Sequence, residues 1–405
     1  MAERYAGTTR KAATAVPPYR GRRLGAWPPY GMDCYDIAII GGGPAGALCA
    51  WLLAMAPGRR VVLLDAEAAP RHRPCGEYLS PGGLGVLDRA GLLEQVLATG
   101  PQRLNALALR GPHGGHAVRH RPVLGFAPPI PFGLGVRRER FDLALQDAAA
   151  ERATLLRSAR VQELTRDAAG WVLTTGDGRR LSAGLVIGAD GRGSMVRRTL
   201  GLDRKPTRQR FALVARATGI LHGDVAEMHL SPLGQIGLCP LGGGEVNLNL
   251  LLAAESSGLL RRLPRQRLLL AALAATPGLH ARCHGLRLGP VMATGSLPQG
   301  CRTVVADGAA LVGDAAGFCD PFTGEGMSLA LRGAEILATA IADGRGLAGY
   351  ASGFARTIGR RRRIGELLQG LIRRRRFAEG VAAHIDGLPM LARLLVADAG
   401  GYRRL

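Results

Sequence analysis

The sequence of 405 residues contains few lysines and few aromatic residues. Lys11 and Lys205 are its only lysines, and aromatic residues make up 4% of the chain. So few aromatic side chains argue against a stacking surface for single-stranded nucleic acid. No apolar run reaches the roughly 18 residues that a membrane-spanning helix needs, and no export signal is visible.

Seven cysteines are present, and none of them belongs to a C-x-x-C pair. This pattern disfavours a disulfide framework and a structural zinc site, so we predict no metal site. Reduced thiols are typical of the cytoplasm, where we expect the protein to be located.

Arginine, by contrast, is abundant. The chain has 53 basic and 31 acidic residues and a formal net charge of +22. Part of the excess lies in residues 351–405, where Arg360–Arg363 and Arg373–Arg376 flank apolar pairs. These clusters are typical of a solvated helix face or of an interfacial helix that makes peripheral membrane contact, and both interpretations stay open. Residues 1–32 are basic and proline-rich, and we predict a disordered N-terminal extension there.

A glycine-rich turn follows the first buried strand pattern. Ile37–Ile40 is typical of such a strand, Gly41–Gly46 is a G-x-G-x-x-G turn, and Ala45–Met55 is helix-forming. Val61–Leu64 predicts the next strand, and Asp65 follows it. In this context the glycines allow a tight turn and close approach of a pyrophosphate, and the carboxylate binds ribose hydroxyls. The segment predicts a Rossmann-type dinucleotide-binding unit on a parallel sheet.

Two further aspartates stand at glycine turns after buried strands. Asp190 lies within Gly188–Ser194, and Asp314 lies within Leu311–Ala316, which Asp320–Gly326 follows. An α/β sheet presents its ligand contacts at the carboxyl ends of its strands. We therefore expect both turns to contact a ligand.

The three motifs, in this order and spacing, resemble the flavoprotein hydroxylase superfamily of the p-hydroxybenzoate hydroxylase type. The resemblance covers residues 33–345 and implies an FAD-dependent oxidoreductase. It implies cofactor binding by Gly41, Gly43, Pro44, Ala45, Gly46, Asp65, Arg73, Arg138, Asp190, Gly191, Gly313, Asp314, Pro321, Gly324, Gly326 and Met327. Within this set the first glycines would line the pyrophosphate, Asp65 the adenosine ribose and Asp314 the ribityl chain.

The resemblance also implies that Pro321 to Gly326 lie beside the flavin ring, which makes Pro321 and Gly324 candidate catalytic positions. A helix that begins near Gly324–Gly326 would point backbone N–H groups at the ring and favour the negative charge of reduced flavin. Arg138 looks like the family arginine that reaches the FAD. The alternative for Arg138 is a solvated arginine.

The sequence Pro74-Cys75-Gly76-Glu77 is similar to an element of the geranylgeranyl reductase-like branch. In that branch the Cys–Gly pair lies near the flavin, so Cys75 is a candidate catalytic residue. A small buried thiol in a turn is the alternative, and both interpretations stay open.

Residues 208–252 alternate enough to predict an antiparallel sheet. Because alternate strand residues share a face, Gln235, Asn247 or Asn249 is expected at the substrate cavity. His229 is a candidate proton donor, although an isolated histidine on a strand is more often structural.

The resemblance and the order of elements predict an α/β fold with two domains in an α+β arrangement. A discontinuous Rossmann-type FAD-binding domain combines residues 33–77, 137–204 and 300–345, and a β-sheet substrate domain combines residues 78–136 and 205–299. Residues 346–405 are predicted to form a helical C-terminal segment.

The leading functional hypothesis is an NAD(P)H- and O2-dependent monooxygenase that hydroxylates a hydrophobic aromatic or polyketide-like metabolite. No second G-x-G-x-x-G marks a nicotinamide domain, which is compatible with NAD(P)H as a transient reductant. The alternative within the superfamily is saturation of isoprenoid C=C bonds, which Pro74–Glu77 favours. A basic FAD-binding protein that interacts with RNA is an alternative of another class, which the net charge motivates. The sparse aromatic residues oppose it, so we predict no nucleic-acid partner.

Overall fold

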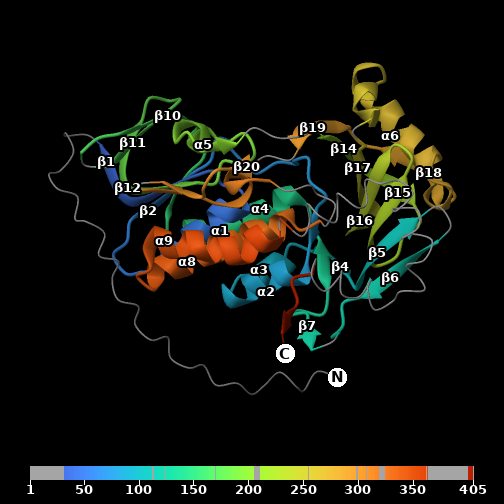
Figure 1. The fold of residues 1–405 in the computed structure, drawn as a ribbon, viewed down its shortest axis with the longest axis horizontal. Coiled ribbons are helices and arrows are strands. Elements are labelled where there is room, and N and C mark those ends of the chain that lie inside the picture. The colour runs from blue at the N-terminus through green and yellow to red at the C-terminus, as the bar shows by residue number, and fades with distance from the viewer. Residues whose placement is uncertain are drawn as a thin grey trace.

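The computed structural model describes residues 32–404 except 112–113, 124, 169, 205–209, 254, 298–299, 307, 319–323, 362 and 364–399. The predicted N-terminal extension therefore lies outside the described residues apart from Met32, and so do Pro321 and Arg373–Arg376. Two large β-sheets lie toward opposite ends of the long axis of the molecule, with helices between them (Figure 1).

The first sheet is parallel, with antiparallel additions. β1 (Asp33–Ile40) pairs in parallel with β2 (Val61–Leu64) on one side and with β12 (Arg180–Gly188) on the other. The parallel strands β9 (Thr154–Leu156) and β22 (Ala309–Leu311) and the antiparallel strands β10 (Val161–Arg166), β11 (Trp171–Thr175) and β21 (Val305–Ala306) complete it. Every residue of β2 is apolar and buried, as expected where both faces of a parallel sheet are covered.

Helices α1 (Pro44–Leu53), α4 (Arg138–Ala150) and α8 (Gly326–Ala342) pack against one another beside this sheet (Figure 1). α1 is the central one, and nearly all its residues are buried because α4 and α8 both contact it. α9 (Gly346–Phe354) packs on α8 and continues into a π-helical turn over Ala355–Gly359.

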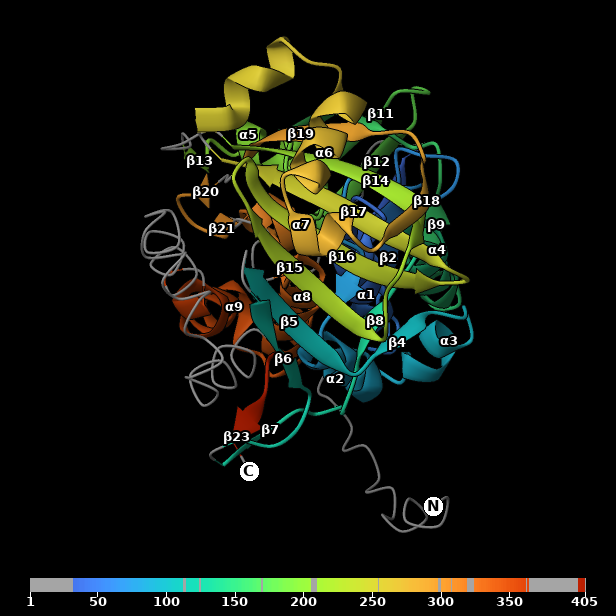
Figure 2. The same cartoon turned by 90° about the vertical axis from the view of Figure 1, so that its right-hand side faces the viewer.

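The second sheet is antiparallel except where β15 pairs with β5, and its order is β18-β14-β17-β16-β15-β5-β6, with β19 also paired to β14. Its strands are β5 (Ala106–Gly111), β6 (Gly114–Arg119), β14 (Arg210–Ile220), β15 (Val225–Ser231), β16 (Gly234–Gly242), β17 (Glu245–Leu252), β18 (Cys283–Leu288) and β19 (Met292–Leu297). The 3-10 helix η1 (Glu255–Arg261) and helices α6 (Arg265–Ala274) and α7 (Pro277–His280) follow β17 on its outer side (Figure 2). The predicted α/β fold with a Rossmann-type sheet and a second β-sheet is confirmed.

Alternation along β17 separates the two faces of the second sheet. Leu248 and Leu250 are buried in a core that α6 completes with Leu269 and other leucines. Asn247 and Asn249 alternate with these leucines and therefore lie on the opposite face, toward the first sheet. Asn247 bonds to the loop before residue 78, so this face is the inner one. That Gln235, Asn247 or Asn249 meets the substrate cavity stays a prediction.

Helices α2 (Pro81–Arg89) and α3 (Leu93–Leu97) correct the predicted boundary at residue 78. Residues 78–136 were expected to belong to the substrate domain, yet Leu84, Leu87 and Leu93 are buried in the core of the first domain, and α2 packs on α8. Small sheets connect these parts: β3 (Tyr78–Leu79) with β8 (Gly133–Gly135) and β4 (Gln102–Leu104), and β13 (Asp203–Arg204) with β20 (Gly300–Cys301).

The end of the chain differs from the predicted helical segment over residues 346–405. Within the described residues the chain is helical up to Arg361, but β23 (Arg403–Arg404) pairs with β7 (Phe126–Ala127). The Gly82 N–H donates to the Gly400 carbonyl oxygen at 2.7 Å, which ties this strand to the start of α2. None of the described helices is long and apolar enough to span a membrane.

Tyr350 anchors α9 to the sheet and generates the first testable prediction. Its side chain is fully buried, and its hydroxyl donates to the Leu311 carbonyl oxygen at 2.6 Å. Tyr350→Phe removes this donor, so we expect the free energy of unfolding to fall by about 1 kcal/mol in urea titrations. Tyr35→Phe is the control, because the Tyr35 hydroxyl bonds to none of the described residues. Equal losses in both variants would contradict the assignment.

Candidate functional site

The G-x-G-x-x-G turn joins β1 to α1. Gly41 has φ +112°, a region that favours glycine, and a Cβ there would overlap the Ala189 carbonyl. A Cβ on Gly46 would overlap the Gly41 carbonyl oxygen. The first turn of α1 can therefore pack against the glycine turn only because residue 46 has no side chain. By contrast, no atom of the described residues beyond its two chain neighbours lies within 4 Å of the Cβ position of Gly43, the N-cap of α1.

Open space and backbone donors therefore coincide at the start of α1. Gly43 offers no side-chain cap, and the first turn contains no acidic residue. Pro44 lacks an N–H, and the Ala45 and Gly46 N–H groups precede the first intrahelical donor, the Ala47 N–H, which bonds to the Gly43 carbonyl oxygen. The helix dipole adds partial positive charge at the same end. These features fit the pyrophosphate of FAD, which needs close backbone approach and N–H donors.

Asp65 lies at the same edge of the sheet and is 8% exposed. Its Oδ2 accepts a hydrogen bond from Gln146 Nε2 at 2.6 Å, and Gln146 also donates to the Gly42 carbonyl oxygen at 2.9 Å. Gln146, on α4, thus joins the carboxylate to the glycine turn, a role that sequence reasoning missed. Arg73, expected beside the cofactor, is instead 42% exposed, and its guanidinium lies 3.7 Å from Glu67.

The carboxylate of Asp190 bonds within its own turn. Its oxygens accept hydrogen bonds from Ser194 Oγ at 2.5 Å and from the Met195 N–H at 2.6 Å, and these bonds cap α5 (Met195–Thr199). Gly191 follows with φ +77° and open space at its Cβ position. Asp190 therefore shapes the turn, and its predicted contact with FAD stays a prediction.

The turn that contains Gly313 and Asp314 reaches α1 from the other side. Gly313 has φ +59°, and a Cβ there would lie 3.0 Å from Ala45 Cβ. Arg197 is 3% exposed and donates to the Ala315 carbonyl oxygen at 2.9 Å, which connects the helix after Asp190 to this turn. The structure thus brings all three motifs together around the first turn of α1, with the half-buried Asp314 beside them.

α8 begins at Gly326, as expected from the sequence, but its N-cap is Glu325, which is 6% exposed. Arg361 Nη1 pairs with the Glu325 carboxylate at 2.9 Å and offsets the negative charge at this end of the helix. Gly324 has φ +66° and abuts the Tyr78 ring, and Met327 is buried on α8. The role of Gly324 stays a prediction, and Pro321 lies outside the described residues.

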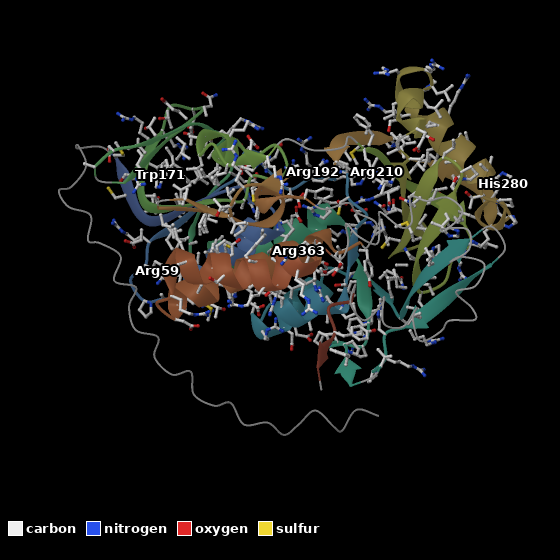
Figure 3. The ribbon with its side chains drawn as sticks, in the orientation of Figure 1. Arg59, Trp171, Arg192, Arg210, His280 and Arg363 are labelled. Atoms are coloured by element: carbon white, nitrogen blue, oxygen red, sulfur yellow. The ribbon has the colours of Figure 1, made fainter. Side chains whose placement is uncertain are left out.

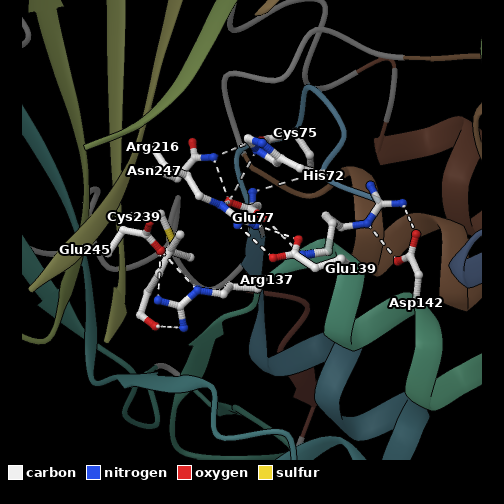
Figure 4. Close-up of polar contacts among 12 residues, drawn as sticks. His72, Cys75, Glu77, Arg137, Glu139, Asp142, Arg216, Cys239, Glu245 and Asn247 are labelled. Atoms are coloured by element: carbon white, nitrogen blue, oxygen red, sulfur yellow. Dashed lines mark hydrogen bonds and ion pairs between the residues drawn. The ribbon is translucent and has the colours of Figure 1, made fainter. Parts of the chain in front are cut away.

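Glu77 is the charged residue through which the loop at Cys75 contacts the second sheet (Figure 4). Its side chain is fully buried, and φ is +55°, which is unusual for a residue other than glycine. Oε1 accepts from the Arg138 N–H at 3.0 Å, and Oε2 accepts from Asn247 Nδ2 at 3.0 Å. Asn247 also donates to the Cys75 carbonyl oxygen at 2.9 Å, so one amide holds both ends of this short loop.

Arg216, on β14, supplies the positive charge that Glu77 requires. Its Nη2 lies 2.5 Å from Glu77 Oε1, and its Nε donates to Glu77 Oε2 at 3.1 Å. The same guanidinium donates to both carboxylate oxygens of Glu139 on α4 at 2.7 Å. Burial and the positive charge of Arg216 lower the pKa of His72, whose Nε2 lies 4.0 Å from Glu77. His72 is therefore neutral near pH 7, and Arg216 carries the counter-charge.

Arg138 is not a solvated arginine. Its guanidinium is bidentate on Asp142, with Nε–Oδ1 at 2.8 Å and Nη2–Oδ2 at 2.6 Å. Burial opposes its charge, but the Asp142 carboxylate raises the pKa of Arg138 above its ordinary value. Burial also raises the pKa of the Cys75 thiol, although the nearby Arg138 acts in the opposite direction. The Cys75 thiol is therefore protonated at neutral pH.

His229 lies away from this site. It follows Glu227 on β15, and its Nε2 lies 2.7 Å from Glu227 Oε2. Burial alone would raise the pKa of the Glu227 carboxyl, but His229 and Arg282 lower it to about 2. Ser231, on the same face of the strand, bonds to α6, so this face is the outer one. The structural interpretation of His229 is favoured over that of a proton donor to substrate.

The glycine turn generates a prediction with an internal control. We expect Gly46→Ala to lower both FAD retention and thermal stability, because its methyl group would displace α1 from Gly41. Gly43→Ala should fold with nearly unchanged stability, since none of the described residues occupies that space, but it should retain less FAD. Flavin absorbance after gel filtration and the melting temperature measure the two effects. Equal behaviour of the two variants would contradict the assigned geometry.

Removing the charge of Glu77 tests the connection between the two domains. Glu77→Gln keeps the side-chain shape but leaves Arg216 with Glu139 alone, and we expect the free energy of unfolding to fall by about 3 kcal/mol. The control is Glu245→Gln, because the neighbouring Arg137–Glu245 pair joins the same domains at 2.8 Å but has partners that are 23% and 27% exposed. That variant should lose less than about 1 kcal/mol. Urea unfolding measures the loss of stability in both variants. A larger loss for Glu245→Gln than for Glu77→Gln would show that the buried Glu77 carboxylate is not the stronger connection.

Comparisons with known proteins agree with this geometry. A family model described as FAD binding domain matches residues 34–229. Menaquinone reductase of Mycolicibacterium smegmatis is 29% identical over 321 residues, which are 75% of this chain and 75% of that protein. Ubiquinone hydroxylase UbiL of Rhodospirillum rubrum is 29% identical over 323 residues, which are 75% of this chain and 71% of that protein.

The fold is also shared with solved structures. A flavoprotein/dehydrogenase from Cytophaga hutchinsonii superposes with a TM-score of 0.77 at 20% identity, over 90% of this chain and 92% of that chain. The glycine turn, the FAD-binding model and these relatives lead to one conclusion. The chain contains an FAD binding domain over residues 34–229 and is an FAD-dependent oxidoreductase that is similar to proteins of the p-hydroxybenzoate hydroxylase-like superfamily.

Proposed function

We propose that the protein is an FAD-dependent monooxygenase that uses NAD(P)H and O2 to hydroxylate a hydrophobic, quinone-like aromatic substrate. The observation that carries this proposal is the extent of the likeness to ubiquinone hydroxylase UbiL. The FAD binding domain model ends at residue 229, whereas the alignment with that hydroxylase spans 323 residues. The likeness therefore includes part of the second sheet, where we place the substrate.

The inner face of the second sheet supports a substrate with an apolar body and oxygen substituents. Ala212, Leu251 and Leu297 form a buried apolar cluster, and Phe318 packs against it. Arg192 lies between the two sheets, with its guanidinium 5.4 Å from the Phe318 ring centre (Figure 3). This combination of apolar side chains and one nearby cation suits a planar ring that carries a carbonyl or hydroxyl group.

Asn249 is the amide that we assign to substrate recognition. It stands on the inner face of β17, and a Cβ on Gly76 would lie 3.4 Å from its Nδ2. A Cβ on Gly237, on the neighbouring strand β16, would lie 2.5 Å from the same nitrogen. Two glycines therefore make room for Asn249 between the sheet and the Cys75–Gly76 pair. Asn247 is committed to Glu77, whereas among the described residues Asn249 makes only one longer bond, from its Nδ2 to Asn247 Oδ1 at 3.4 Å, so we assign Asn249 to substrate.

FAD, when bound, supplies the electron transfer between NAD(P)H, O2 and substrate. The residues of the chain bind and orient it: the start of α1 holds the pyrophosphate, and the Asp65–Gln146 pair meets the ribose. Glu77 and Arg216 fix the Cys75 loop against the second sheet. The apolar cluster around Leu251 excludes water from the substrate side. We assign NAD(P)H the role of a transient reductant.

Reduction of a C=C bond is the second candidate, and two observations favour it. The alignment with menaquinone reductase covers the same share of this chain, 75%, as the alignment with the hydroxylase. In addition, burial keeps the Cys75 thiol protonated, so this loop holds a proton donor that a reduction requires.

Dependence on oxygen separates the two candidates. The FAD-loaded enzyme is incubated with NADH or NADPH and short-chain ubiquinone and menaquinone analogues, in air and under strict anaerobiosis, and products are identified by mass spectrometry. We expect a product with one added oxygen atom, formed only in air, and near-normal turnover of Cys75→Ser. Anaerobic formation of a product with added hydrogen, lost in Cys75→Ser, would reject the hydroxylase and favour the reductase.

A further inference from the structure

One long stretch of the sequence contains no acidic residue. Between Glu255 and Asp307 there are seven arginines and neither aspartate nor glutamate, although the whole chain has 31 acidic residues. The stretch also contains no phenylalanine, tyrosine or tryptophan. No acidic residue of the same stretch therefore offsets its positive charge, and the stretch has no aromatic ring for a nucleic-acid base to stack on.

The charge gathers on the outermost layer of the second sheet. α6 lies on the outer side of this sheet (Figure 2). η1 ends at Arg261 and α6 begins at Arg265, and every residue from 261 to 267 is exposed. Arg261, Arg262, Arg265 and Arg267 form no ion pair with any described residue. Arg282, which follows α7, differs from them because the buried Glu227 carboxylate holds it at 2.7 Å.

Leucines are exposed among these arginines. Leu263 is 37% exposed and Leu270 is 38% exposed, and they belong to a short set of large apolar side chains with high exposure in the described part of the chain. On α6, Arg267, Leu270 and Ala274 follow helical spacing on the solvent side, while Leu269 and Leu273 face the sheet. Exposure of a leucine to water costs free energy, so the presence of two exposed leucines among these arginines calls for an explanation.

We propose that residues 261–274, here called the α6 surface, bind peripherally to an anionic lipid bilayer. Arginines that have no partner among the described residues can pair with lipid phosphates, while Leu263 and Leu270 enter the apolar boundary between them. The absence of aromatic residues favours lipid over nucleic acid as the anionic partner. Because α6 covers the outer face of the sheet, contact there leaves the inner face and the cofactor site uncovered. The proposal does not depend on which reaction the enzyme catalyses.

The test compares two charge reversals in the full-length, FAD-loaded protein. Vesicles of phosphatidylglycerol mixed with phosphatidylcholine, and vesicles of phosphatidylcholine alone, are sedimented with the protein at several salt concentrations. We expect binding to the anionic vesicles alone, weakening with salt, and a loss of about tenfold or more in R261E/R262E. The matched control is R160E/R180E, which changes the same charge on the first sheet, directly before β10 and at the start of β12. Both arginines are exposed and form no ion pair with a described residue.

A second variant separates insertion from attraction between charges. L263S/L270S keeps the net charge, and it should still lose vesicle binding while it retains FAD content and melting temperature. Unchanged binding in R261E/R262E would overturn the proposal, because the α6 surface would then not contact the vesicles. An equal loss in R160E/R180E would also overturn it, because net charge alone would then explain the effect. Binding to a single-stranded RNA homopolymer without binding to anionic vesicles would also overturn it and assign the surface to nucleic acid.

Discussion

The buried carboxylate of Glu77 fixes the position of the second sheet relative to the first, and the rest of the site depends on it. A carboxylate with no exposed surface is stable only when donors replace the water that it has lost. Glu77 receives them from three directions: the backbone of α4, the guanidinium of Arg216 and the amide of Asn247. The site between the domains is therefore a consequence of satisfying one charge, and not only of apolar packing.

The same arrangement explains why the loop at Cys75 is held firmly between the first sheet and the second. Asn247 bonds to the Cys75 carbonyl oxygen and to Glu77, and the Glu77 N–H lies 3.4 Å from the Cys75 sulfur. Arg138 approaches the thiol while its own charge is satisfied by Asp142. Because each of these groups is already bonded, none moves freely toward a ligand. The thiol is thus positioned by the loop around it, whichever reaction it accompanies.

Sequence reasoning predicted the features whose signal is local. The glycine turn, Asp65 and the start of α8 each follow from a short motif, because steric limits on backbone approach act over a few residues. It missed α2, whose three glycines disfavour a helix by propensity. In the fold these glycines are needed, since a Cβ on Gly83 would lie 2.6 Å from the Ser328 hydroxyl of α8.

The partners of buried charges were also beyond local reasoning. Gln146 is separated from Asp65 by 81 positions and Arg216 from Glu77 by 139, so only the fold shows that they meet. One signal was present: Arg216 interrupts an apolar strand sequence, Phe-Ala-Leu-Val-Ala-Arg-Ala, and a buried strand accepts a charge only opposite a counter-charge. The strand at Arg403–Arg404 carries no such signal, because its pairing partner lies nearly 300 positions away.

The net charge of +22 therefore has more than one physical origin. Arg197 and Arg216 are largely buried, and their guanidinium groups donate hydrogen bonds that hold turns and domains together. The arginines at 261–267 are exposed and have no such role among the described residues. A charge that stabilises the fold has an acidic partner nearby, whereas one kept for an external partner does not. By this criterion the outer layer of the second sheet is a place, within the described residues, where several unpaired charges gather and are available to a partner.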